Sequence, residues 1–167
     1  MSGESKLKVH LEFGEANVNL EGNVDEVFKL IVRFLTQVYP NLEVIRKIIY
    51  APDYIGLVEE LSDLMKITPE GPVIVSNLAM SARGMMRLAL LGADVGSKLG
   101  ILSRESLSSN ELSKITGKAK KTIMNEIPKL ITRGLIEKTS GGEYKITTLG
   151  IRRTENLIKE YKRSIKS

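Results

Sequence analysis

The chain of 167 residues contains no cysteine, no tryptophan and one histidine, His10. Without cysteine it can form neither a disulfide nor a metal site built on thiolates. Aromatic residues make up 5% of the sequence, too few for a platform that stacks the bases of single-stranded nucleic acid. No apolar run is long enough to cross a bilayer, and the first ten residues lack the apolar core of a secretory signal. We therefore expect a cytoplasmic protein that has no membrane partner.

Sequence motifs of catalysis are missing as well. The chain has no phosphate-binding glycine loop, no dinucleotide-binding fingerprint and no cluster of residues with metal-ligand spacing. Acidic residues gather around one expected helix, at Asp53, Glu59, Glu60 and Asp63. A solvated helix face explains these residues better than a catalytic pair, because no supporting partner accompanies them. We expect no enzyme activity, no cofactor and no metal.

Charge is distributed unevenly along the chain. Residues 1–97 hold 9 Lys and Arg against 13 Asp and Glu, a net charge of −4, whereas residues 98–167 hold 16 against 7, a net charge of +9. Together these give the overall charge of +5. Such a split suggests two parts with different partners, and a basic half suits a polyanion such as nucleic acid.

The first part of the chain indicates a hairpin followed by helices. Apolar and polar residues alternate over residues 7–13 and again over residues 16–20, and Gly14-Glu15 between them suits a type II′ turn. Asn23 and Glu26 have the spacing of a capping box that starts a helix, which Pro40 ends. Two more amphipathic segments cover residues 42–49 and 54–65. We interpret residues 1–66 as a β-hairpin/helical unit for sensing or oligomerisation.

Residues 67–76, "ITPEGPVIVS", contain two prolines and a glycine and are interpreted as a linker, in which "VIVS" could form a short strand. A helical pattern returns over residues 77–98 and includes Gly84, Gly92 and Gly96. Each glycine costs a helix roughly 1 kcal/mol relative to alanine. Close approach of another helix would explain them, either within the chain or at a dimer seam.

The segment "ELSKITGKAKKTIMNEIPKLITRGLIEK", Glu111 to Lys138, predicts two short helices joined at Gly117. Ser108 and Glu111 form a second capping-box pattern. In the second helix, Ile123, Ile127 and Leu130 share one face and should be buried. The opposite face begins with lysines and carries Thr122 and Asn125. Lysines and threonine can bind phosphates, and asparagine can bond adenine edges, so this face suits the major groove of DNA.

A hairpin should follow, with strands at residues 135–138 and 143–147 around a turn at Ser140-Gly141-Gly142. The arrangement "SSNELSKITGKAKKTIMNEIPKLITRGLIEKTSGGEYKITTLG" resembles the winged helix-turn-helix transcription regulators of bacteria and archaea. The resemblance covers residues 84–163 and rests on the Gly-Lys turn, the "RGLIE" helix end and the "YKIT" strand before "TLG". It implies an α+β protein: a small N-terminal hairpin-and-helix unit, then a winged helix-turn-helix domain at residues 77–167.

The resemblance also implies a partner and a site. The partner would be double-stranded DNA, bound by a regulator acting as a homodimer whose effector the sequence does not identify. An apolar stripe on the last helix, through Leu157 and Tyr161, could form the dimer or could pack on the domain itself. The expected DNA-binding residues are Ser108, Ser109, Lys118, Lys120, Lys121, Thr122, Asn125, Lys129, Lys138 and Lys145.

Pro128 departs from this pattern, because a proline inside a helix removes a hydrogen bond and clashes with the preceding turn. The recognition helix should therefore kink there, or end near Glu126 and restart. This proline and the acidic first half keep open an alternative, in which the winged helix is a protein-protein interaction module of a transcription or assembly complex and reads no bases.

Overall fold

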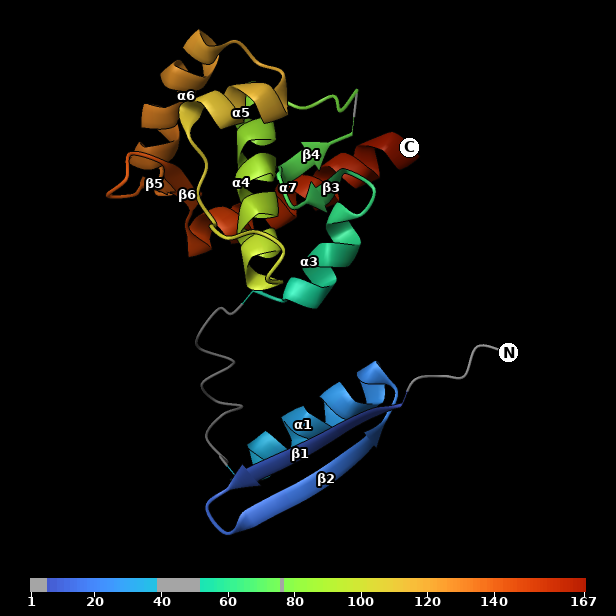
Figure 1. Ribbon diagram of the computed structural model, residues 1–167. Helices are drawn as coiled ribbons and strands as arrows, with labels where there is room; N and C mark the ends of the chain where they lie inside the picture. Colours follow the sequence, from blue (N-terminus) through green and yellow to red (C-terminus); the bar gives the residue numbers. More distant parts are fainter. Residues whose placement is uncertain (1–5, 39–51, 76) are drawn as a thin grey trace. The chain divides into compact units, whose positions relative to one another are not determined.

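The computed structural model describes residues 6–38, 52–75 and 77–167 as an α+β protein with small antiparallel sheets (Figure 1). The chain divides into two compact units, Met1–Ala51 and Pro52–Ser167. The boundary that we expected after residue 66 is therefore wrong. Residues 52–66 belong to the second unit, because Leu57, Leu61 and Leu64 are buried in its core.

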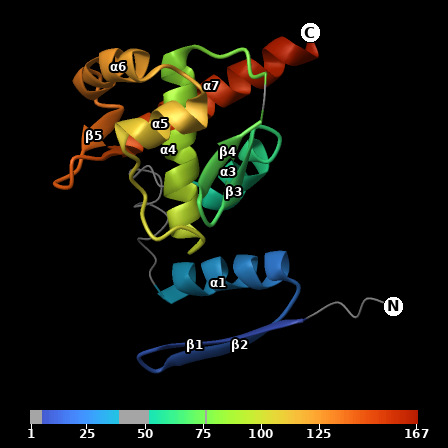
Figure 2. The ribbon, with the colours of Figure 1, turned by 45° about the horizontal axis from the view of Figure 1, so that its top comes forward.

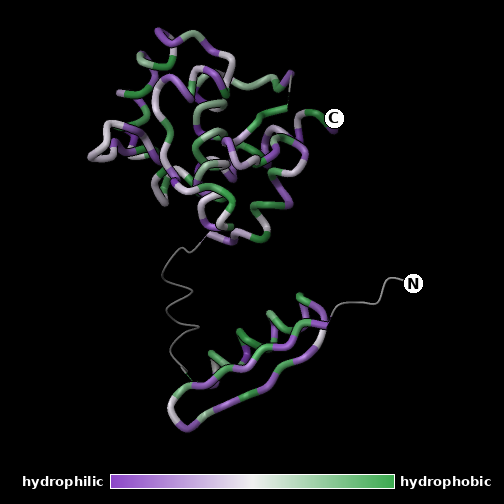
Figure 3. The backbone as a smooth tube through the Cα atoms, in the orientation of Figure 1, coloured by the Kyte–Doolittle hydropathy of each residue, from purple (hydrophilic) through white to green (hydrophobic). Residues whose placement is uncertain are grey.

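The first unit has the predicted hairpin and helix. Strands β1 (Leu7–Phe13) and β2 (Ala16–Gly22) pair antiparallel with Phe13 opposite Ala16. Gly14 has φ +60° and Glu15 does not have a positive φ, which fits the predicted type II′ turn. Figure 3 shows hydrophilic and hydrophobic residues alternating along both strands.

Helix α1 (Val24–Val38) begins at the predicted capping box. The Glu26 amide donates to Asn23 Oδ1 at 2.9 Å, and the Asn23 amide donates to Glu26 Oε2 at 3.2 Å. The helix covers the hairpin through Val27, which is fully buried. The amphipathic segment expected at residues 42–49 lies outside the described residues.

The second unit is built around helix α4 (Ala82–Lys98), which is buried on most of its surface from Gly84 to Gly96. Around α4 lie α3 (Tyr54–Leu61), the hairpin of β3 (Met65–Thr68) and β4 (Gly71–Ile74), α5 (Ser109–Thr116), α6 (Lys120–Thr132), the hairpin of β5 (Ile136–Lys138) and β6 (Tyr144–Ile146), and α7 (Thr148–Lys166) (Figure 2).

The segment expected to be a linker, residues 67–76, mostly forms the second hairpin. Thr68 lies opposite Gly71, and Met65 lies opposite Ile74. The hairpin packs against α4, and Met65 is buried. The linker interpretation fails because the prolines and glycine occupy a tight turn and an edge position, where both residue types are tolerated.

The glycines of α4 make room for neighbours within the same unit. A Cβ on Gly92 would lie 2.5 Å from Met65 Sδ and 3.1 Å from Pro72 Cβ, and one on Gly96 would lie 2.8 Å from Ile67 Cγ2. A Cβ on Gly84 would lie 3.3 Å from Leu157 of α7. Of the two explanations for these glycines, packing within the chain is correct, and a dimer seam is not needed.

Helix α7 also packs on its own unit. Ile151, Thr154 and Ile158 are buried, and Tyr161 packs against the same core. Lys162 forms ion pairs with Glu60 of α3 at 3.2 Å and with Asp63, just after α3, at 3.6 Å. Only the end of the apolar stripe, Ile165, remains exposed.

Candidate nucleic-acid interface

Helices α5 and α6 have the predicted boundaries and the predicted inner faces. Gly117 ends α5 in the left-handed conformation, with φ +67°, and α6 starts three residues later. Ile123, Ile127 and Leu130 of α6 are buried, as the spacing predicted. Their burial turns the opposite side of α6 toward solvent.

The start of α6 carries positive charge without a local counter-charge. Lys120 and Lys121 lie exposed in its first turn, next to the half-buried Lys118. The N-cap residue, Ala119, makes no side-chain capping bond, and no acidic residue lies in the first turn. Cations at the positive end of a helix are unfavourable, so this end would be stabilised by an external anion.

None of these three lysines forms a side-chain ion pair with the described residues. Asn125, one turn further along α6, is exposed, and Thr122 is half-buried. The first half of α6 and the turn before it therefore present three cations, a hydroxyl group and an amide group from one short stretch of chain. This is the composition of a surface that binds a phosphate backbone and contacts base edges.

Lys129 differs from the lysines at the start of α6. Its Nζ lies 2.8 Å from Glu126 Oε1, and Arg83 Nε of α4 lies 2.6 Å from Glu126 Oε2. The hydrogen bonds from Lys129 and Arg83 hold the pKa of Glu126 below its ordinary value. Lys129 is therefore partly neutralised by its own helix.

Pro128 lies within α6, which runs without interruption from Lys120 to Thr132. The possibility that the helix ends near Glu126 is therefore excluded. Pro128 is exposed and follows the segment with the unpaired lysines, and the Thr132 hydroxyl donates to its carbonyl oxygen at 2.8 Å. The backbone bond that Pro128 cannot donate would end on the Met124 carbonyl oxygen, so the disruption lies in the middle of α6, about one turn beyond Lys120 and Lys121.

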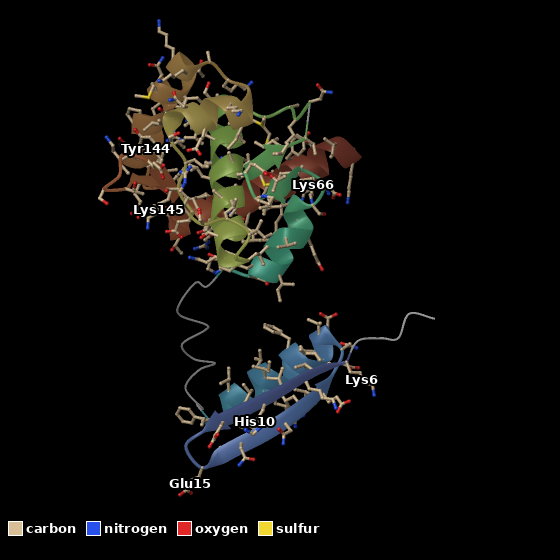
Figure 4. The ribbon with its side chains drawn as sticks, in the orientation of Figure 1. Lys6, His10, Glu15, Lys66, Tyr144 and Lys145 are labelled. Carbon is tan, nitrogen blue, oxygen red and sulfur yellow. The ribbon has the colours of Figure 1, made fainter. Side chains whose placement is uncertain are left out.

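The hairpin after α6 presents one unpaired lysine and one paired lysine. Lys138, at the end of β5, is exposed and forms no ion pair with a described residue. Lys145, which lies on β6 (labelled in Figure 4), has its Nζ 3.2 Å from Glu137 Oε1 and 3.2 Å from Glu105 Oε1. Hydrogen bonds to Glu137 and Glu105 raise the pKa of Lys145. We had expected Lys145 to contact DNA, but two carboxylates already hold it.

The N-terminus of α5 is closed by the predicted capping box. The Ser108 hydroxyl accepts from the Glu111 amide at 3.2 Å, and the Glu111 carboxylate accepts from the Ser108 amide at 2.8 Å. Ser109, the first helical residue, is half-buried beside this cap. Because the Glu111 carboxylate already occupies this helix end, a DNA phosphate would meet negative charge there.

An ion-pair network that the sequence did not reveal surrounds the capping box. Arg104 lies 2.5 Å from Glu111 Oε1 and 2.7 Å from Glu143 Oε1, and the Ser106 hydroxyl bonds the same Glu143. Burial opposes the ionised form of Glu111, but hydrogen bonds from Arg104 and Ser108 prevail and lower its pKa. Residues 104 and 143 are too far apart in sequence for a local pattern to pair them.

Leu107 joins the hairpin as a third extended segment. Its amide donates to the Tyr144 carbonyl at 2.8 Å, and the Tyr144 amide donates to its carbonyl at 2.9 Å. The spatial order is therefore Leu107, β6, β5. This bridge fixes the hairpin beside the start of α5.

Comparisons with known proteins identify no relative: no family model, no curated protein and no solved structure matches the chain. Within residues 6–38, 52–75 and 77–167, no three metal-ligating side chains come together as a metal site. In the same ranges, no helix combines the length and the apolar character required to cross a membrane.

Proposed function

We propose that residues 82–166 form a winged helix-turn-helix that binds double-stranded DNA and regulates transcription. The observation that carries the proposal is the start of α6, where Lys118, Lys120 and Lys121 lie at an uncapped helix end and form no ion pair with any residue that the structure describes. A DNA phosphate would supply the missing negative charge, and Asn125 would face the base edges.

The order of the elements supports the same proposal. Helix α4, the Leu107 segment, α5, α6 and the β5–β6 hairpin follow one another as in the winged-helix regulators that the sequence resembles. In this arrangement α6 would be the recognition helix, and the hairpin would be the wing beside it. The wing would contribute Lys138 to the DNA backbone.

Several residues that we expected to bind DNA are bonded within the protein, so the proposed interface is smaller than the one expected from the sequence. Its centre is the first half of α6 together with Lys138. Lys129, Lys145 and Ser108 belong at most to its edge, because each is already bonded within the protein. Ser109 lies beside the same acidic cap.

A protein-interaction role for the winged helix is the second candidate. The observation that favours it is the hairpin side of the domain, where Glu105, Glu137 and Glu143 neutralise Lys145 and Arg104. A surface of paired charges is a poor match for a polyanion and a better match for another protein. No catalytic role is proposed for the chain.

Binding to random-sequence duplex DNA separates the two roles. The full chain should shift a labelled duplex of about 20 base pairs at low salt and should release it as the salt concentration rises, because phosphate contacts displace counterions. Phosphate contacts are strong at about 50 mM salt. A chain that does not shift the duplex at this concentration would favour the protein-interaction role.

We also propose that the regulator acts as a homodimer in the cytoplasm. The glycines of α4 and the stripe of α7 do not support this, because both are used within the chain. Exposed apolar side chains on α1, Val24 at 65% and Phe28 at 48%, are the remaining support. Two copies would bind half-sites about 10 base pairs apart or a multiple of that spacing.

A further inference from the structure

A cavity of about 380 Å³ lies between the start of α4 and the second half of α6. Three arginines line it: Arg83 and Arg87 from α4, and Arg133, the residue that caps the end of α6. The only acidic residue in its lining is Glu126. We call this cavity the arginine cavity.

The charges in the arginine cavity do not balance. Glu126 is bonded by Arg83 at 2.6 Å and also by Lys129 at 2.8 Å, from outside the lining. Within the described part of the chain, the side chains of Arg87 and Arg133 form no hydrogen bond or ion pair. Glu126 is thus shared by Arg83 and Lys129, and the guanidinium groups of Arg87 and Arg133 have no bonded carboxylate among the described residues.

Arg87 is the most unusual of the three arginines. Its Nε atom is buried and has no acceptor, and no other buried side-chain nitrogen or oxygen of the described residues lacks a partner. Burial lowers the pKa of Arg87, repulsion from Arg83 and Arg133 lowers it further, and Glu160 only partly offsets them. Packing alone does not explain this residue, because an apolar side chain would fill the space without the cost of desolvating a cation.

The backbone adds to the positive character of the cavity. Ser81 and Ala82 at the start of α4 line it, and the Ser81 hydroxyl bonds only the Gly84 amide of the first turn. The remaining amides at this end point out of the helix, and the helix dipole favours an anion there. Guanidinium groups together with a helix N-terminus are the combination that proteins use to bind phosphate.

We propose that the arginine cavity binds a doubly charged phosphate group, held by Arg87 and Arg133 and by the start of α4. The two guanidinium groups that lack a bonded carboxylate match the two charges of a phosphate dianion. The volume is at the lower end of small-molecule sites, so the cavity can hold a phosphate together with a small attached group. The site is separate from the lysines at the start of α6 and does not depend on the proposed function.

A calorimetric titration of the full chain with pyrophosphate, at constant ionic strength, tests the site without DNA. Saturable binding to the wild type is expected, and Arg133→Gln and Arg87→Gln should each weaken it about tenfold or more, because each removes charge-assisted hydrogen bonds. Arg163→Gln, which removes an exposed arginine of α7, is the matched control and should bind as the wild type does.

The proposal is overturned if the wild type shows no saturable binding, or if Arg133→Gln and Arg163→Gln bind pyrophosphate equally. Arg133 lies exposed at a helix end, so its substitution should leave the fold intact even if Arg87→Gln does not.

A second arm uses duplex DNA to identify the source of the phosphate. If Arg133→Gln also weakens DNA binding and pyrophosphate competes with the duplex, the cavity holds a phosphate of the DNA backbone. If DNA binding is unchanged, the cavity holds a free phosphorylated small molecule. A chain that binds pyrophosphate but no DNA would refute the proposed function and leave this site established.

Discussion

A Cβ atom at position 150 would lie 2.0 Å from the carbonyl oxygen of Leu135. That oxygen already accepts a hydrogen bond from the Thr147 amide at 3.1 Å, so it cannot easily move. Gly150→Ala should therefore destabilise the second unit by about 2–4 kcal/mol. Urea unfolding followed by circular dichroism measures the change. Gly141→Ala, whose Cβ would meet Thr139 Oγ1 only at 3.9 Å, is the control and should stay within about 0.5 kcal/mol of wild type.

Asp94 is a buried acid whose main partner is Tyr54, which donates to its Oδ2 at 2.9 Å. Burial raises the pKa of Asp94 above its ordinary 3.8, although the bond from Tyr54 opposes the shift. An acid whose pKa rises on folding binds its proton more tightly in the folded state. The stability that it contributes therefore falls as the pH rises above 3.8.

Asp94→Asn should remove this pH dependence and keep an acceptor for Tyr54. The stability of the variant relative to wild type, measured by urea unfolding at each pH, should improve as the pH rises above 3.8 and should level off once the pH passes the raised pKa of Asp94. A stability difference that stays constant over this range would show that the ionisation of Asp94 is not coupled to folding.

At the scale of single residues, the sequence predicted contacts within one helical turn but not contacts between distant residues. The capping roles of Asn23 and Ser108 were predictable, because both partners lie within one helical turn. The ion pair of Lys145 with Glu105 was not, because 40 residues separate them and only the fold brings them together. Lys145 is therefore bonded within the protein, a contact that the sequence did not reveal, whereas the lysines at the start of α6 carry no ion pair with a described residue.

Among the elements, those with strong local signals were predicted well. The first hairpin has strict alternation and a two-residue turn, and α6 has an apolar face with helical spacing. The β3–β4 hairpin was not predicted, although "VIVS" was named as a possible strand, because both strands have only four residues and β4 contains a proline. Its stability comes from packing against α4, which no local pattern of the hairpin itself records.

Gly92→Leu tests the role of the β3–β4 hairpin. The side chain would collide with Met65 and Pro72, so the substitution should destabilise the second unit by about 1–3 kcal/mol. Thermal unfolding measures the loss, and analytical sedimentation of the folded variant should give the same oligomeric state as the wild type. A different outcome would contradict this role. If the wild type is a dimer, and the variant is a monomer with the thermal stability of the wild type, Gly92 is part of an intermolecular contact.

For the whole molecule, the division at residue 51 decides which fragment can fold alone. Residues 52–167 contain the complete core, whereas residues 77–167 lack Leu57, Leu61 and Met65, which are all buried against it. The longer fragment should unfold cooperatively, and the shorter one should be largely unfolded or much less stable. Circular dichroism during heating compares them, and equal stability would show that α3 and the β3–β4 hairpin do not support the core.

The salt dependence of duplex DNA binding tests the central claim most directly. Four lysines form no ion pair with the described part of the chain: Lys118, Lys120, Lys121 and Lys138. Each should neutralise one phosphate, so the log–log slope of the binding constant against salt should be about −3.6 per subunit. Lys120→Gln with Lys121→Gln should change the slope to about −1.8. The control pair Lys159→Gln with Lys166→Gln, exposed on α7, should leave it unchanged. Equal slopes for the two double variants would contradict the account.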